Sequence, residues 1–229
     1  MCSYKKIFDK KSIISILKVN SDLMIRTTCL LIQTNIFAAS SALLGTNILS
    51  ANSILLQVQS IISYSFDGLA NTASVYAGKS VGQKSKELLV SACRRTAQWV
   101  VIFIVITTAG FALLRNDIIY LFTDIESIIL LVKQYDFWIL LFPILSGAGL
   151  AFYGIFTGTA ETKPIRNSAL LALILCLLTW KIGVPRWGNH GLWMSLLAFY
   201  FGRTIFCFLN YKKYSIKYEE TMKFYYYNI

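Results

Sequence analysis

The stretch TTCLLIQTNIFAASSALLGTNILSANSILLQVQSIISYSF, from Thr27 to Phe66, contains no charged residue. A helix that spans a bilayer needs about 20 mostly apolar residues, so this stretch is long enough for two spans. The turn-forming sequence Gly45-Thr46-Asn47 lies near its middle. The sequence therefore predicts two membrane helices here, over about residues 23–44 and 48–77.

Outside this pair, apolar runs predict four more spans, at residues 96–114, 137–159, 165–184 and 190–211. The short amphipathic segment Ile125–Gln134 is expected to lie at the membrane interface. Residues 1–22 read as a basic, amphipathic cytoplasmic segment, and residues 212–229 as a cytoplasmic tail. The predicted fold class is an all-α polytopic membrane protein with six transmembrane helices.

The composition of the chain agrees with this fold class. Of its 229 residues, 56% are hydrophobic and only 14% are charged, whereas a soluble domain averages about 25% charged. One soluble core could not bury so much apolar surface, and a disordered chain would contain far less of it.

The basic residues indicate the orientation. Seventeen Lys and Arg fall in the two terminal segments and in the predicted loops at about 78–95 and 160–166, whereas three fall in the opposite loops. Because cytoplasmic loops carry the excess of Lys and Arg, both termini are predicted to lie in the cytoplasm, with the chain in the inner membrane. The net charge of +11 therefore indicates contact with anionic lipid, and nucleic acid is not an expected partner.

Catalysis and metal binding are not expected. The five cysteines are widely separated, and His190 is the only histidine, so zinc-ligand spacing and a serine–histidine triad are both missing. The sequence also lacks the motifs of nucleotide-binding, dinucleotide-binding, metalloprotease and serine-hydrolase sites. We therefore predict a protein that is not an enzyme and has no cofactor.

The first two predicted spans are rich in polar residues, including Gln33 and Asn35 in the first. On the second, Gln57, Ser60 and Tyr64 share one helical face, and Asn52 is expected at its edge. An unsatisfied polar group in hydrocarbon costs several kcal/mol, so these side chains must face protein or water. Two interpretations remain open for each residue, a hydrated cavity or interhelical hydrogen bonds, and the group as a whole favours the cavity.

Asp67 and Arg203 are charged residues within the predicted spans and away from their first and last turns, except that Asp67 approaches the cytoplasmic surface. Asp67 is the only charged residue between Arg26 and Lys79. A charge inside a span costs about 3 kcal/mol or more, so Asp67 is a candidate for proton or cation coupling, with a structural role near the cytoplasmic surface as the alternative. Arg203, in the last span, either lines the cavity or extends its side chain towards the inner face.

The segment ILSANSILLQVQSIISYSFDGLANTASVYAGKSVG, from Ile48 to Gly82, resembles the eighth span of MATE (multidrug and toxic compound extrusion) transporters of the DinF-like branch. The matching positions are Asn52, Gln57, Tyr64, Asp67, Gly68, Ala70, Gly78 and Gly82. Further similarity lies at Leu121–Thr123, Gly158–Ser168 and Gly191–Trp193, in the same order and spacing. The resemblance covers about residues 18–213.

This resemblance implies the C-terminal lobe of a transporter built from two six-helix lobes. Such a protein exports organic, drug-like compounds in exchange for H⁺ or Na⁺, and opens its cavity alternately to each side. The implied partners are the lipid bilayer, an organic substrate, and a complementary N-terminal lobe or a second copy of the chain. Uncharged Gln33, Ser146 and Ser74 stand where parts of the family carry acids, and the main coupling aspartate of the DinF-like branch belongs to a span in the other lobe.

Three hypotheses follow: half of an antiporter that is inactive alone, a six-helix carrier that works as a homodimer, and an inert fragment or non-transporting structural or regulatory subunit. The candidate coupling and cavity residues are Asp67, Gln33, Asn35, Asn52, Gln57, Tyr64 and Arg203.

Overall fold

The computed structural model describes residues 10–227, and all of its regular structure there is helical. The helices are α1 (Lys10–Leu43), α2 (Thr46–Gly82), α3 (Lys86–Phe122), α4 (Glu126–Tyr135), α5 (Phe137–Gly158), α6 (Lys163–Trp187) and α7 (Asn189–Tyr227). The prediction of an all-α fold is confirmed. Residues 1–9 and 228–229, at the ends of the two predicted cytoplasmic segments, lie outside the described residues.

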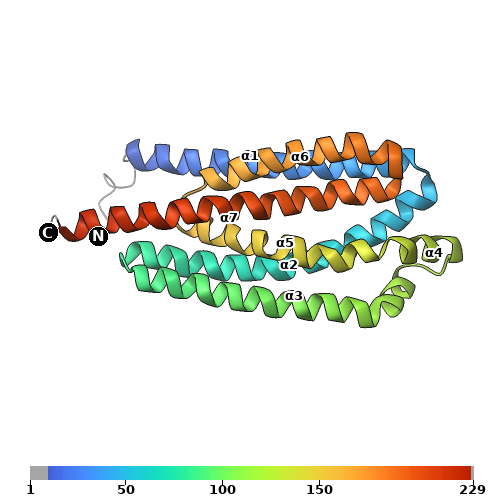
Figure 1. The fold of residues 1–229 in the computed structure, drawn as a ribbon, viewed down its shortest axis with the longest axis horizontal. Coiled ribbons are helices and arrows are strands. Elements are labelled where there is room, and N and C mark those ends of the chain that lie inside the picture. The colour runs from blue at the N-terminus through green and yellow to red at the C-terminus, as the bar shows by residue number, and fades with distance from the viewer. Residues whose placement is uncertain (1–9, 228–229) are drawn as a thin grey trace.

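Short turns join α1 to α2 and α6 to α7, and the two helices of each pair run antiparallel (Figure 1). Gly45, between α1 and α2, has a φ of 123°, and Gly188, between α6 and α7, has a φ of 52°. These left-handed conformations suit glycine because it lacks a Cβ. Ser85 precedes α3, and its hydroxyl accepts a hydrogen bond from the backbone N–H of Leu88 at 3.2 Å.

The helices extend past the predicted spans. α1 runs without a break from Lys10, α3 begins at Lys86 and not near residue 96, and α7 continues to Tyr227. Hydropathy marks only the part of a helix that suits hydrocarbon, whereas a helix ends where a breaking residue stops it. No Gly or Pro occurs in α1, or in α7 after Gly202, so both helices continue through their basic segments.

Four described helices are long and apolar enough to cross a membrane: α3, α5, α6 and the Asn189–Leu209 part of α7. The other two predicted spans lie in α1 and α2, which have 34 and 37 residues. Their length suffices, but their polar side chains lower their hydropathy.

The bundle has two distinct ends (Figure 1). The start of α1, the end of α7 and the α2–α3 and α5–α6 connections lie at one end, which we call the terminus end. The α1–α2 and α6–α7 turns and the short helix α4 lie at the other, the turn end. α5 is central and packs on α2, α3 and α7, while α6 packs on α7 and α1.

α2 and α5 approach each other with backbone in contact. A Cβ added to Gly154 would strike the carbonyl group of Ala70, and one added to Gly158 would strike that of Ser74. Glycines four residues apart on one helix allow such an approach. This contact fixes the position of α2, the helix that carries Asp67.

Candidate functional site

Three polar side chains of α2 lie on the side of the helix that faces away from the bundle. Gln57 is exposed, Tyr64 is 70% exposed, and Ser60 between them is half-buried. The Ser60 hydroxyl donates only within its own helix, to the Leu56 carbonyl at 2.9 Å. We call Gln57, Ser60 and Tyr64 the polar stripe. It lies on the surface of the lobe and not inside it.

Asn35 on α1 is also exposed. Its Nδ2 donates to the carbonyl of Leu31, one turn earlier, at 2.8 Å. The residue therefore makes no hydrogen bond to another helix within residues 10–227.

Asn52 lies off the polar stripe and is buried at the turn end, so the prediction that it borders the stripe is wrong. Its Nδ2 donates to Ser41 Oγ at 2.8 Å and to Asn189 Oδ1 at 2.7 Å. Its Oδ1 accepts from Asn189 Nδ2 at 3.0 Å and from Trp193 Nε1 at 2.9 Å. Every hydrogen-bonding position of this amide is used, so the interpretation as an interhelical contact holds for Asn52.

Tryptophans complete this end of the bundle. Trp193 is fully buried and contacts the ring of Phe37 at 5.1 Å between centroids. Trp180 donates from Nε1 to Ser40 Oγ at 2.8 Å. The N–H groups of these two tryptophans join α6 to α1 and α7 to α2.

Gln33 is buried on the inner face of α1, 3% exposed. Its neighbours one turn away on the same face are Cys29, which packs in a cluster with Phe199, and Phe37. It therefore lies within the lobe, apart from the exposed polar stripe.

Arg203 on α7 is 5% exposed. Its guanidinium lies 5.8 Å and 5.9 Å from the ring centroids of Phe199 and Tyr200. Within residues 10–227 it forms neither a hydrogen bond nor an ion pair. A buried guanidinium without an acidic partner is costly, so this group is placed to interact with a nearby charge or with water.

Asp67 and Arg26 lie near enough to Arg203 to act on its charge. Asp67 is half-buried. The Arg26 guanidinium lies over the Tyr153 ring at 4.0 Å, and its Nε is buried without a hydrogen-bond partner. Asp67 and Arg203, two of the predicted residues, are thus within electrostatic range of each other, and no ion pair joins them in residues 10–227. We call Arg203, Arg26 and Asp67 the arginine–aspartate cluster.

Gln59 connects α2 to α7. It is buried, and its Nε2 donates to Tyr200 Oη at 3.2 Å and to Ser63 Oγ at 3.2 Å. Gln59 is absent from the predicted site residues. The sequence gives little reason to choose Gln59 over Gln57. Both are glutamines of α2, and they differ only in the side of the helix on which they lie.

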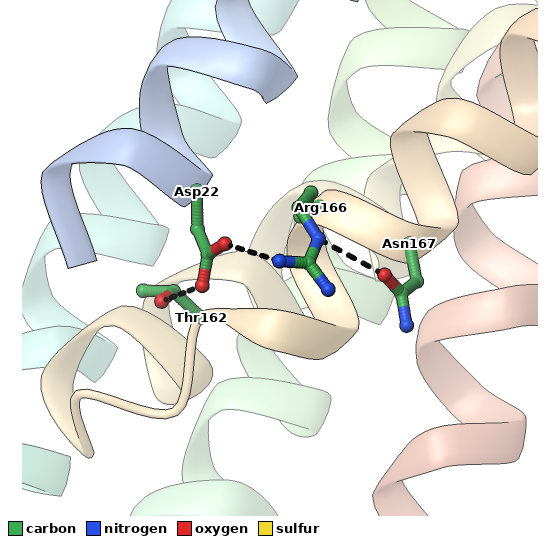
Figure 2. Close-up of polar contacts among 4 residues, drawn as sticks. All are labelled: Asp22, Thr162, Arg166 and Asn167. Atoms are coloured by element: carbon green, nitrogen blue, oxygen red, sulfur yellow. Dashed lines mark hydrogen bonds and ion pairs between the residues drawn. The ribbon is translucent and has the colours of Figure 1, made fainter. Parts of the chain in front are cut away.

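A buried carboxylate at the terminus end was also missed. Figure 2 shows Asp22 of α1, 7% exposed, accepting a hydrogen bond from Thr162 Oγ1 at 2.7 Å and pairing with Arg166 Nη1 at 2.9 Å. Arg166 Nε also donates to Asn167 Oδ1 at 3.1 Å. These contacts tie α1 to the α5–α6 connection. An acid at the end of a basic segment was the available signal.

The turn end holds a second partly neutralised acid. Asp136, between α4 and α5, is buried and lies 3.7 Å from Arg115 Nη1. Burial raises the pKa of Asp136, while the charge of Arg115 opposes the rise. Lys133 lies with its Nζ 5.4 Å from the Tyr120 ring centroid.

The fold, the apolar helices and the exposed polar stripe define an all-α membrane protein whose lobe presents a polar face. The sequence profile of the MatE family matches residues 24–179, and the chain belongs to this family of membrane transporters, associated with multidrug efflux.

Two relatives are similar to much of the chain. It is 28% identical over 188 residues to DNA damage-inducible protein F of Escherichia coli strain K12, covering 80% of this chain and 40% of that protein. It is 23% identical over 184 residues to the probable multidrug resistance protein NorM of Photorhabdus laumondii subsp. laumondii, covering 76% of this chain and 40% of that protein. The chain thus spans about 40% of the length of these relatives.

Proposed function

We propose that this chain supplies the C-terminal lobe of an ion-coupled antiporter that exports organic, drug-like compounds, and that it works only with a second six-helix lobe. The observation that carries the proposal is the exposure of the polar stripe. Gln57 and Tyr64 lie on the surface of a lobe whose family resides in the membrane. Facing lipid, they would cost several kcal/mol.

A water-filled passage between two lobes removes that cost. Exposed polar groups on α2 would then contact water and substrate, while the apolar surface of α3 faces lipid. The fraction of either relative that the chain matches, about 40%, leaves room for a second lobe of similar size.

Asp67 is the proposed coupling residue. It is half-buried, and its negative charge acts on the buried Arg203, so a proton or Na⁺ arriving at Asp67 would weaken its attraction to the arginine. Such a change can shift the equilibrium between the two conformations of the transporter only if Asp67 and Arg203 interact differently in each conformation. The backbone contact of α2 with α5 would transmit the change through the lobe.

Two alternatives have specific support. A homodimer would place two polar stripes face to face, and oligomers favour such two-fold symmetry. A non-transporting subunit is favoured by Asn52 and Gln33, since the structure buries both inside the lobe and neither faces a passage.

The orientation is part of the proposal. We infer that the terminus end faces the cytoplasm, because the α2–α3 connection and the flanking helix ends carry the basic residues. A cysteine introduced at Gln83 should then resist a membrane-impermeant thiol reagent in intact cells. Labelling from outside would reverse the orientation.

The test of function compares the chain alone with the chain joined to the first half of the Escherichia coli relative. In cells that lack other exporters, we expect ethidium efflux only from the joined protein. Asp67→Asn should abolish efflux in the joined protein, whereas Asp117→Asn, which removes an exposed acid at the turn end, should leave it intact. Efflux by the chain alone would favour the homodimer, and undiminished efflux by the Asp67→Asn variant would remove Asp67 from the mechanism.

A further inference from the structure

A hollow of about 430 Å³ lies between α2 and α3 near the terminus end. α2 contributes Leu69, Thr72, Ala73 and Tyr76, and α3 contributes residues from Leu88 to Trp99. The aromatic side chains of Tyr76 and Trp99 are 50% and 51% exposed. Most of the lining is apolar, so the hollow suits a hydrocarbon chain.

A second, shallow and open surface depression adjoins the first, and all of its lining residues belong to α3. The two share Ser91 and Arg95 as lining residues. The second is also lined by Lys86 and Arg94, with Glu87 as the acid in its lining. We call the two together the α2–α3 crevice. It is apolar and aromatic in one part and cationic in the other.

The crevice lies at the level where α3 becomes apolar. The charge-free run of α3 begins at Thr96, directly after Arg94 and Arg95, and Trp99 is one turn further in. Of the four apolar helices, α3 is the least buried, with 11% of its most apolar window covered by the rest of the described chain. In a bilayer, its arginines therefore lie at the headgroup level and Trp99 at the edge of the hydrocarbon.

We propose that the α2–α3 crevice binds an anionic phospholipid. The phosphate lies on Arg95 and Arg94, whose planar guanidinium groups suit phosphate oxygens. An acyl chain runs past Tyr76 and Trp99. A zwitterionic lipid offers less net charge to these arginines, so the site discriminates by headgroup.

This inference depends on the membrane location of the family and not on transport. It goes beyond the proposed function, because a lipid site on α3 can exist in an active or an inactive lobe. If the lipid test fails, the transport proposal is unchanged. If the transport test fails, the lipid proposal is unchanged.

The test uses tryptophan fluorescence in vesicles. The whole chain is reconstituted in dioleoyl phosphatidylcholine that contains brominated phosphatidylglycerol or, separately, the same fraction of brominated phosphatidylcholine. Bromine quenches nearby tryptophan, and the difference between the wild type and Trp99→Phe isolates the signal of Trp99. We expect phosphatidylglycerol to associate about three to ten times more strongly than phosphatidylcholine, as two favourable arginines at a membrane surface allow.

The double variant Arg94→Gln/Arg95→Gln should reduce this preference to that of a neutral site. Both arginines are exposed, so the variant is expected to fold, and circular dichroism checks this. Arg186→Gln removes an exposed arginine at the turn end and should keep the preference. Equal quenching of Trp99 by the two lipids would contradict the proposal. So would no quenching at all, which would mean that protein covers the crevice.

Discussion

Asn52 on α2 and Asn189 at the start of α7 exchange two hydrogen bonds, at 2.7 Å and 3.0 Å, through their side-chain amides. The pair joins segments that are 137 positions apart in the chain. It fixes the turn end of the lobe, where Ser41 and Trp193 bond to the same amide.

Asn52→Ala should destabilise the lobe. It removes four hydrogen bonds and leaves the buried groups of Asn189 and Trp193 without partners, at a cost of about 2 kcal/mol. Thermal unfolding of the purified protein in detergent measures the loss. Asn35→Ala is the matched control, because this exposed amide bonds only within its own helix. Equal midpoints for the two variants would mean that the network does not stabilise the lobe.

The Asp22–Arg166 pair should show energetic coupling. Asp22→Asn and Arg166→Gln each break a contact at the terminus end, and the double variant should cost less than the sum of the two. We expect a coupling energy of about 1–2 kcal/mol for this partly buried pair, from a double-mutant cycle of unfolding free energies. A second double-mutant cycle, with Arg186→Gln and Asp22→Asn, is the control. Its coupling energy should be near zero. Additive effects for Asp22 and Arg166 would show that the pair is only a surface contact.

Gly154→Ala should push α2 away from α5. The new methyl group meets the carbonyl of Ala70, and overpacking of this kind costs about 1–3 kcal/mol. Gly110→Ala on α3 is the control, since no atom lies within 4 Å of the added Cβ. The replacement should leave α3 as stable as before or slightly more so. Similar thermal midpoints for both variants would rule out a tight α2–α5 crossing.

Asp136 should make stability depend on pH. Burial raises its pKa in the folded protein, so the folded state holds the proton more tightly than the unfolded state. The contribution of Asp136 to stability is therefore full below the ordinary aspartate pKa and is lost as the pH rises through the raised value. Asp136→Asn should unfold at a higher temperature than the wild type at pH 7, with a smaller difference at pH 4.

The control for this effect is Asp124→Asn, which removes an exposed acid close to α4. Its difference from the wild type should be small and change little between the two pH values. A wild-type advantage at pH 7 would mean that the Arg115 ion pair outweighs the effect of burial at Asp136.

The sequence was sufficient to predict the helices because apolar runs and turn residues act locally. The Gly45 turn and helix α4 follow from local composition, and the shared face of Gln57, Ser60 and Tyr64 follows from their spacing along one helix. The full lengths of α1 and α7 could not be predicted in this way, because hydropathy indicates the solvent around a segment and not the residue at which its helix ends.

The partners of polar residues could not be predicted in the same way. Asn52 and Gln57 are both amides of α2 on different sides of the helix, and the sequence does not show that Asn52 meets Asn189 of α7. Asp22 looked like one residue of a solvated basic segment because its partner, Arg166, lies on another helix. The proximity of Asp67 to Arg203 depends on the α2–α5–α7 packing for the same reason.

The central claim is that the face of the lobe carrying the polar stripe borders water while α3 borders lipid. Cysteine accessibility in the joined two-lobe protein, with the five native cysteines replaced, tests this most directly. Gln57→Cys and Tyr64→Cys should react with a membrane-impermeant thiol reagent from at least one side of the membrane. Val105→Cys, on the 60% exposed apolar surface of α3, should not react. Unreactive cysteines at both stripe positions, or equal labelling at Val105, would contradict the account.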